Sequence, residues 1–504
     1  MTSQASREQA QRLFDLSQRL LDDGGSVEAV GKARMAVRCL RGSVEGRFNL
    51  ASVLIDAAGQ LPRARYAREG VELLLSIEKD LPDELEAQFH YNLGNAYSVI
   101  GRRERGKGPG TKPSLLTAIS HLDHSLTLEE LPNARVNLAR ALLMQGRWIE
   151  SHDQFNAVVD EHPDHHQALA LRGSSLMGIH NWTSGHKGLL TGALMDHQRA
   201  ESLAAGDQLS CRSYRSVIRD LQRAGIEAYE PRAVERTPDQ AWIIEQGLGL
   251  NPCPICHVES PGAFDLYPLA ARIEGGSRRP PVEAAIEIVN AVCRSYATSR
   301  WILYKAMCSL PEEGDHVISL RVHPDSVHDL GVGLIMSAIS GFYSLLGQTA
   351  YGLNSYFRLG HDPKYVTFET VWYDAGSKRK GAPKDRSQIH SKLVRRPWPA
   401  LSALYSLARS LEIGRGHYEQ LRTLRNRIEH HVVVASPTAS DEHRFVALSV
   451  DELRSAALQM GRIAKAAVWY FGAAVFHDEL QRLGRAAKRG CRIHPGSGLS
   501  VERS

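Results

Sequence analysis

Apolar and small residues recur at helical spacing through the first part of the chain, in paired segments separated by a turn residue. The clearest copy of the pattern consists of Leu138, Ala139, Leu142, Gly146, Ser151, Phe155 and Pro163. It returns about 34 residues later, where Trp182 stands in the place of Trp148. One helical hairpin cannot bury its apolar face alone, so the repetition predicts hairpins stacked on one another.

Two earlier copies precede this one. They comprise Leu93, Gly94, Tyr97 and Gly101, resuming at Ala118, Leu122 and Ser125 after a polar insertion, and Leu50, Ala51 and Leu54. The pattern resembles tetratricopeptide repeats, with an ordinary helical bundle as the alternative. Residues 1–205 are therefore expected to form a repeat domain whose concave surface binds a protein or peptide partner.

Prolines interrupt the helical pattern in residues 206–281, which we interpret as a connector with short helices such as 213–223. Cys253, Cys256 and His257 have the spacing of half a zinc site, but a second pair of ligands is missing. Thiols without a metal are the favoured interpretation, so no metal and no cofactor are predicted.

From residue 282 onward the pattern predicts long helices, over 282–307, 331–359, 401–413, 418–431 and from 449 to about 485. The last one begins at Ser449-Val-Asp-Glu452, which has the form of a capping box. Residues 432–434 and 445–450 are predicted to pair as a short hairpin. The expected fold class is all-α, with a helical domain at 282–485 and a basic tail at 486–504.

Composition narrows the possible classes of protein but does not indicate a function. Of the 504 residues, 43% are hydrophobic and 23% charged, as in ordinary soluble proteins. Seven scattered cysteines and a polar N-terminal segment favour a cytoplasmic location. The most apolar run, 466–476, is shorter than the ~18 residues that a membrane span needs. The net charge of +5 permits a nucleic-acid partner without arguing for one.

The predicted helix 418–431 carries the candidate chemistry. Arg425, Asn426 and His430 supply a permanent cation, an amide and a group that titrates near neutral pH. Metal-free RNA cleavage needs these parts, because an acid or base moves the protons and a guanidinium offsets the charge on the phosphate. The basic segment 376–396 is expected to be a solvated loop, with phosphate binding as the alternative.

The spacing of the motif sets a geometric condition. At about 100° per residue, Arg425 and His430 lie roughly 140° apart around a straight helix, so one copy cannot place both on one phosphate. Either the helix deforms near the motif, or two copies meet across a twofold axis. The alternative without catalysis is an ion pair between Arg425 and Glu429, with His430 and His431 exposed at a helix end.

The Arg-Asn-x-x-x-His element, late in a helical region, resembles the HEPN superfamily, in particular the branch that joins tetratricopeptide repeats to a C-terminal HEPN domain. The resemblance covers residues 240–480. It rests further on Trp242 with Leu248-Gly-Leu-Asn251, Asn290 with Arg300-Trp-Ile-Leu-Tyr304, Phe342-Tyr343 with Leu353-Asn-Ser-Tyr-Phe357, and Phe368 with Val371-Trp372. One departure is Gly347-Gln348, which stands where the branch tends to carry an Asp-Lys pair.

The resemblance implies a dimeric, metal-independent endoribonuclease that leaves a 2′,3′-cyclic phosphate and a 5′-hydroxyl, in a toxin or anti-phage defence setting. His430 would be the general acid or base, Arg425 would stabilise the phosphate charge and Asn426 would orient one of them. His431 competes with His430 for its role. The rival hypotheses are a non-enzymatic interaction or RNA-binding protein, and a nucleic-acid binder stabilised by zinc at Cys253 and Cys256.

Overall fold

The computed structural model describes residues 4–61, 64–106, 108–183, 186–229, 234–255, 280–308, 330–374, 389–396, 398–412, 416, 418–430, 433–436, 446–488, 492–494 and 500–502. Most of them are helical, which confirms the all-α fold class. The contacts divide the chain into two compact units. Unit 1 is Met1–Gly106 with Thr111–Gln145, and unit 2 is Lys107–Gly110 with Gly146–Ser504.

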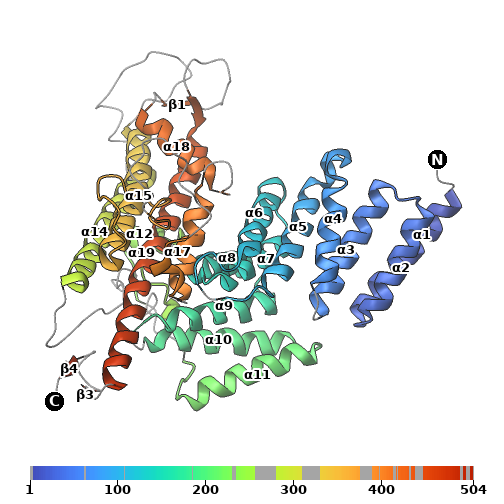
Figure 1. Cartoon of the computed structure of the whole chain (residues 1–504), viewed down its shortest axis with the longest axis horizontal. Helices are drawn as coiled ribbons and strands as arrows, with labels where there is room; N and C mark the ends of the chain where they lie inside the picture. Colours follow the sequence, from blue (N-terminus) through green and yellow to red (C-terminus); the bar gives the residue numbers. More distant parts are fainter. Residues whose placement is uncertain are drawn as a thin grey trace. The chain divides into compact units, whose positions relative to one another are not determined.

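Unit 1 is a series of helices in which each α-helix packs against the next along the chain. Its elements are α1 (Gln4–Asp22), α2 (Ser26–Cys39), α3 (Val44–Gln60), α4 (Arg65–Leu75), η1 (Glu78–Asp80), η2 (Asp83–Leu85), α5 (Glu86–Gly101), α6 (Pro113–Leu128) and α7 (Pro132–Met144), shown in Figure 1. Helical hairpins were expected here, and their assignment as tetratricopeptide repeats stays a prediction.

The close approach of α5 to α6 shows why the pattern in unit 1 carries small residues. A methyl group on Gly94 would lie 2.4 Å from Cγ of Leu122, so a larger residue would push the helices apart. The buried hydroxyl of Ser125 donates a hydrogen bond of 2.8 Å to the carbonyl of Ala87. Both features belong to the sequence repeat and both serve packing between neighbouring helices.

Unit 2 contains the remaining elements (Figure 1). They are α8 (Trp148–Glu161), α9 (His166–His180), α10 (Lys187–Leu203), α11 (Gln208–Arg223), α12 (Pro238–Glu245), α14 (Pro280–Cys308), α15 (Leu330–Phe357), α16 (Ser391–Val394), α17 (Pro399–Ser410), α18 (Glu419–His430), β1 (Val433–Ser436), β2 (Val446–Ser449), α19 (Val450–Lys488), β3 (Arg492–His494) and β4 (Ser500–Glu502).

The core of unit 2 lies among α14, α15 and α19, which pack against one another, with α17 against α19. Tyr296, Phe342 and Trp469 are fully buried there. By length and composition, α15 alone among the described helices could cross a membrane. Its buried positions run from Val332 to Phe357 and the helix packs against α14 and α19, so α15 belongs to the core of unit 2.

The strands next to the motif helix differ from the sequence prediction. β1 and β2 do pair, but in parallel, with Val433 opposite Val446. A tight hairpin would have given an antiparallel pair, so the predicted hairpin is wrong in direction. The capping box is confirmed, because the backbone N–H of Ser449 donates to Glu452 and that of Glu452 to the Ser449 hydroxyl, at 2.7 and 3.1 Å.

Helix α8 is joined to the C-terminal helices through a buried charged group. The Arg147 guanidinium, fully buried at the start of α8, donates to Glu150 from Nε at 2.7 Å and to the Ser410 hydroxyl of α17 at 2.8 Å. Tyr470 of α19 donates to the same carboxylate at 3.1 Å. Burial acts against the charged guanidinium, but Glu150, with smaller contributions from Tyr418 and Tyr470, holds the pKa of Arg147 above its ordinary value.

Part of the predicted connector is ordered by hydrogen bonds to the core. The Leu248 carbonyl accepts from the Tyr296 hydroxyl at 2.9 Å and from Arg300 at 3.1 Å, and the Leu250 carbonyl accepts from the Trp469 indole at 2.6 Å. The domain limits expected at residues 205 and 281 stay predictions, whereas the contacts divide the chain after Gln145.

Candidate active site

Helix α18 packs on α15, and this contact positions the motif. Leu421 is buried in it, while Leu424 and Ile428 are half-buried. The helix is continuous from Glu419 to His430, without the deformation considered above. Arg425 and His430 therefore project about 140° apart around one regular helix.

Arg425 is held by three partners. Nη2 lies 2.6 Å from the Glu429 carboxylate, Nη1 donates to the Asn426 side-chain oxygen at 3.0 Å, and the guanidinium stacks 4.8 Å from the centre of the Tyr343 ring. Its Nε–H is buried and has no hydrogen-bond partner among the described residues. The ion pair with Glu429, which the non-catalytic interpretation expected, is present.

Tyr343 of α15 belongs to a second set of contacts beneath the motif. Its hydroxyl donates to Glu369 at 3.1 Å, and Arg422 lies 3.4 Å from the same carboxylate oxygen. Burial, followed by the charge of Glu369, raises the pKa of Tyr343, so the phenol stays neutral and keeps its donor. Tyr343 thus gives Arg425 a fixed, uncharged surface to rest on.

His430 is the last residue of α18 and is exposed. No contact between His430 and Arg425 is present in the described part of unit 2, so the structure brings Asn426 to Arg425 but not His430 to either of them. His431 lies outside the described residues, as do Cys256, His257 and residues 376–388 of the basic segment. The described end of that segment is not a solvated loop, because it contains α16 with Leu393 buried, and Arg396 pairs with Asp478 at 3.2 Å. Cys253 is buried, and its N–H donates to Asn251 at 3.0 Å.

The departure from the family pattern falls near the same surface. Gly347 is one helical turn beyond Tyr343 on α15, and positions four apart share a face. Gly347 is exposed, and a methyl group added to it would meet no atom within 4 Å. The face that supports Arg425 therefore has open space at the position where an acidic or basic side chain was expected.

Sequence spacing does not assign Tyr343, Glu369 or Arg422 to the site, and of the three only Tyr343 belongs to the residues that carry the family resemblance. A usable signal was the charge of Arg422, which lies three positions before Arg425 and shares its side of the helix. The partners on α15 and in the segment after it cannot be paired with α18 by sequence spacing alone.

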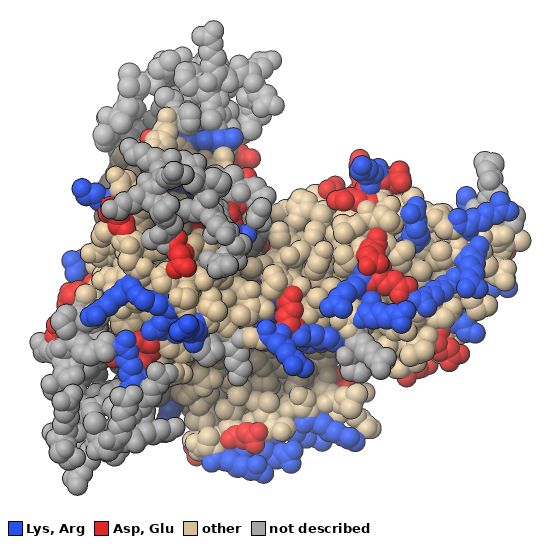
Figure 2. All heavy atoms as spheres, in the orientation of Figure 1, with Lys and Arg blue, Asp and Glu red and all other residues tan. Residues whose placement is uncertain are grey.

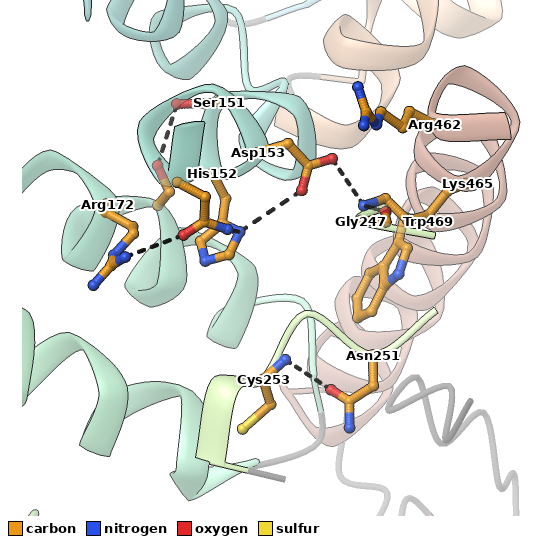
Figure 3. A network of polar contacts seen from close by, with 12 residues as sticks. Ser151, His152, Asp153, Arg172, Gly247, Asn251, Cys253, Arg462, Lys465 and Trp469 are labelled. Carbon is orange, nitrogen blue, oxygen red and sulfur yellow. Dashed lines mark hydrogen bonds and ion pairs between the residues drawn. The ribbon is translucent and has the colours of Figure 1, made fainter. Parts of the chain in front are cut away.

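A second polar cluster lies away from α18, where α8 and α19 meet the connector. Figure 3 shows Lys465 pointing to Asp153 and to the Gly247 carbonyl, at 2.8 and 2.6 Å. Burial alone would raise the pKa of Asp153, but Lys465 and His152 outweigh burial and lower it. Arg172 makes its ion pair with Asp196 beside them. A cavity of about 190 Å³ opens here, and its charges are paired, which indicates a structural role.

Residues 276–478 match the family described as LA2681-like HEPN, and they include α14, α15, α17, α18 and most of α19. The C-terminal part of the chain therefore carries an HEPN domain, and the match supports a function related to RNA or nuclease chemistry. No curated protein matches the chain.

Removing the competing carboxylate tests whether Arg425 is available to a phosphate. If RNA binds at the motif, Glu429→Gln should raise RNA affinity about twofold, because a pair of this spacing is worth about 0.3–0.5 kcal/mol and its loss frees one edge of the guanidinium. The measurement is a filter-binding titration at fixed salt. Glu419→Gln removes the same charge from the first turn of α18 and should change affinity less. Equal effects of the two variants would contradict a special role for Arg425.

Proposed function

We propose that the HEPN domain is a metal-independent endoribonuclease whose catalytic residues are Arg425, Asn426 and His430. The observation that carries the proposal is the motif itself, on an unbroken helix inside the matched region, with its arginine stacked on Tyr343 and bonded to Asn426. A toxin or anti-phage setting and a cytoplasmic location are proposed with it, on the resemblance alone.

Each residue has a role that its chemistry allows. His430 takes a proton from a ribose 2′-hydroxyl or gives one to the leaving 5′-oxygen, since an imidazole can act as either a base or an acid. Arg425 offsets the charge that develops on the phosphate, and its buried Nε–H and stacked ring restrict it to one orientation. Asn426 holds the guanidinium through its side-chain oxygen. The products are a 2′,3′-cyclic phosphate and a 5′-hydroxyl.

The straight helix supports a site shared between two protomers. Because Arg425 and His430 of one α18 diverge, we propose that a homodimer through the HEPN domain places His430 of one protomer beside Arg425 of the other. Each dimer then has two equivalent catalytic centres. His430 is exposed and the Arg425–Glu429 pair is half-exposed, so both motif residues are accessible to a second protomer.

Mixing two inactive variants tests this arrangement. Arg425→Ala and His430→Ala protein, refolded together in equal amounts, should recover about a quarter of wild-type cleavage, because half of the dimers are mixed and each mixed dimer contains one intact centre. The assay is cleavage of a labelled RNA by each variant alone and by the mixture. A mixture as inactive as its components, although mixed dimers form, would show that both residues act from one protomer.

Unit 1 is proposed to bind the partner that directs or restrains the nuclease. It contains a cavity of about 330 Å³ lined by side chains of both charges and by amides, among them Asp22, Asp56, Asn95, Arg102, Asn137 and Arg140. Such a surface fits a peptide that presents both a cationic side chain and a carboxylate. Support comes from the mixture of charges in one hollow, which an apolar packing surface would not need.

The rival function is binding without catalysis, and one observation favours it. Arg425 already has a carboxylate partner in Glu429, so the motif can be stable without RNA. Figure 2 shows basic side chains along α11, where Arg212, Arg215, Arg219 and Arg223 are exposed. In Figure 1, α11 and α18 lie at opposite ends of unit 2, so this stripe supplies no argument for RNA at the motif.

A further inference from the structure

Four side chains of metal-ligating type gather on the α5–α6 hairpin of unit 1. Glu86 and His90 are one turn apart on α5, and His121 and His124 are three positions apart on α6. Residues at these spacings share a helix face. Since α5 and α6 pack closely along their length, the two faces converge.

The convergence brings ligand atoms to distances that one ion can bridge. One such atom from each of Glu86, His90 and His124 lies within 4.8 Å of the others, and Nε2 of His124 is 3.9 Å from the Glu86 carboxylate. A tetrahedral zinc ion with bonds of about 2.0–2.1 Å holds its ligand atoms about 3.3 Å apart. The side chains of His124 and Glu86 are 48% and 47% exposed, so small rotations can close the remaining gap.

Outer contacts orient the imidazoles as metal sites require. Nδ1 of His90 lies 2.9 Å from Nδ1 of His121, so one ring holds the other in a fixed tautomer. Nδ1 of His124 lies 3.4 Å from the Thr127 hydroxyl while its Nε2 faces Glu86.

We propose that Glu86, His90 and His124 bind a divalent transition-metal ion, zinc being the best fit, with His121 positioning His90. Imidazole and carboxylate ligands suit Zn²⁺, and three protein ligands leave one coordination position to solvent. The ion would link α5 to α6, which are connected in the chain by the polar insertion at residues 102–112. It would stabilise the hairpin in unit 1, with no part in the chemistry proposed for α18.

The test is a zinc titration of the full chain after treatment with a chelator and dialysis. A Cys256→Ala background removes the possibility that the Cys253 and Cys256 pair binds the metal. Competition with a chelating dye should show one Zn²⁺ per chain. His90→Ala and His124→Ala should abolish this binding, and His121→Ala should weaken it about 10–100-fold, as loss of an outer partner does. His162→Ala, which alters an exposed histidine of unit 2, should leave the affinity unchanged.

Two further measurements distinguish loss of metal binding from loss of folding. Cobalt in place of zinc should give a visible spectrum of nitrogen and oxygen ligation without thiolate bands. Circular dichroism establishes that each variant is folded, and His124 is half-exposed, so its replacement should not disturb packing. Absence of zinc binding in the Cys256→Ala protein, or equal affinities of that protein and its His90→Ala and His124→Ala forms, would overturn the proposal.

Discussion

Replacing Glu150 with alanine should lower the free energy of unfolding of unit 2 by about 3–5 kcal/mol, because it leaves the buried Arg147 charge without its carboxylate. Arg147 is fully buried, and Glu150 is the only carboxylate that any described contact gives it. The same change removes the acceptor of the Tyr470 hydroxyl. Domains commonly have a free energy of unfolding of only about 5–15 kcal/mol, so the variant should be close to unfolding.

Urea unfolding followed by circular dichroism measures this loss. Asp220→Ala, which breaks the exposed pair with Arg223 on α11, is the matched control and should cost less than about 1 kcal/mol. Ser410→Ala removes one hydrogen bond to Arg147 and should cost about 1–3 kcal/mol, which keeps the test usable if Glu150→Ala does not fold. A Glu150→Ala protein no less stable than the Asp220→Ala control would contradict a buried pair joining α8 to α17 and α19.

Replacing Arg425 with alanine should lower the rate of RNA cleavage about 10²–10³-fold, the usual effect of losing a donor that stabilises transition-state charge. Arg425→Lys should recover only part of the activity. Lysine lacks the planar fork that bonds Asn426, pairs with Glu429 and stacks on Tyr343 at the same time. Single-turnover cleavage of a labelled RNA gives the rates.

The control for charge is Arg427→Ala. Arg427 is exposed on the same helix, two positions further along and so on a different side. It should affect RNA binding as much as Arg425→Ala does and leave the cleavage rate nearly unchanged. Equal losses of cleavage in the two variants would mean that α18 contributes only positive charge, and the binding interpretation would then account for the site.

Local pattern predicted much of the fold. The long helices were expected close to where they occur, and the capping box at Ser449 and Glu452 was predicted from four residues, because both depend on neighbours along the chain. The pairing of β1 with β2 depends on the path of the residues between them, and the short apolar runs carry no information about direction. The packing of α8 on α19 brings together positions more than 300 residues apart, as in the bond between Glu150 and Tyr470.

The candidate site also contains residues that the sequence predicts and residues that only the packing of helices brings in. Arg425, Asn426 and His430 are adjacent in sequence, and the helical wheel already showed that arginine and histidine diverge. The surface that orients Arg425 comes from Tyr343 and Glu369, which no spacing rule joins to α18. The same holds for the histidines of α5 and α6. Each pair is unremarkable on its own helix, and only the packing of the two helices brings the rings together.

Cleavage of RNA by the wild-type protein and by His430→Ala, each with excess EDTA, tests the central claim most directly. The proposed chemistry uses side chains alone, so the wild type should cut at the same rate with and without the chelator. His430→Ala should cut at least about 10²-fold more slowly while binding RNA nearly as well, because the histidine moves protons and holds no charge that binding requires. Cleavage that EDTA abolishes and magnesium restores, or a His430→Ala protein as active as the wild type, would contradict the account.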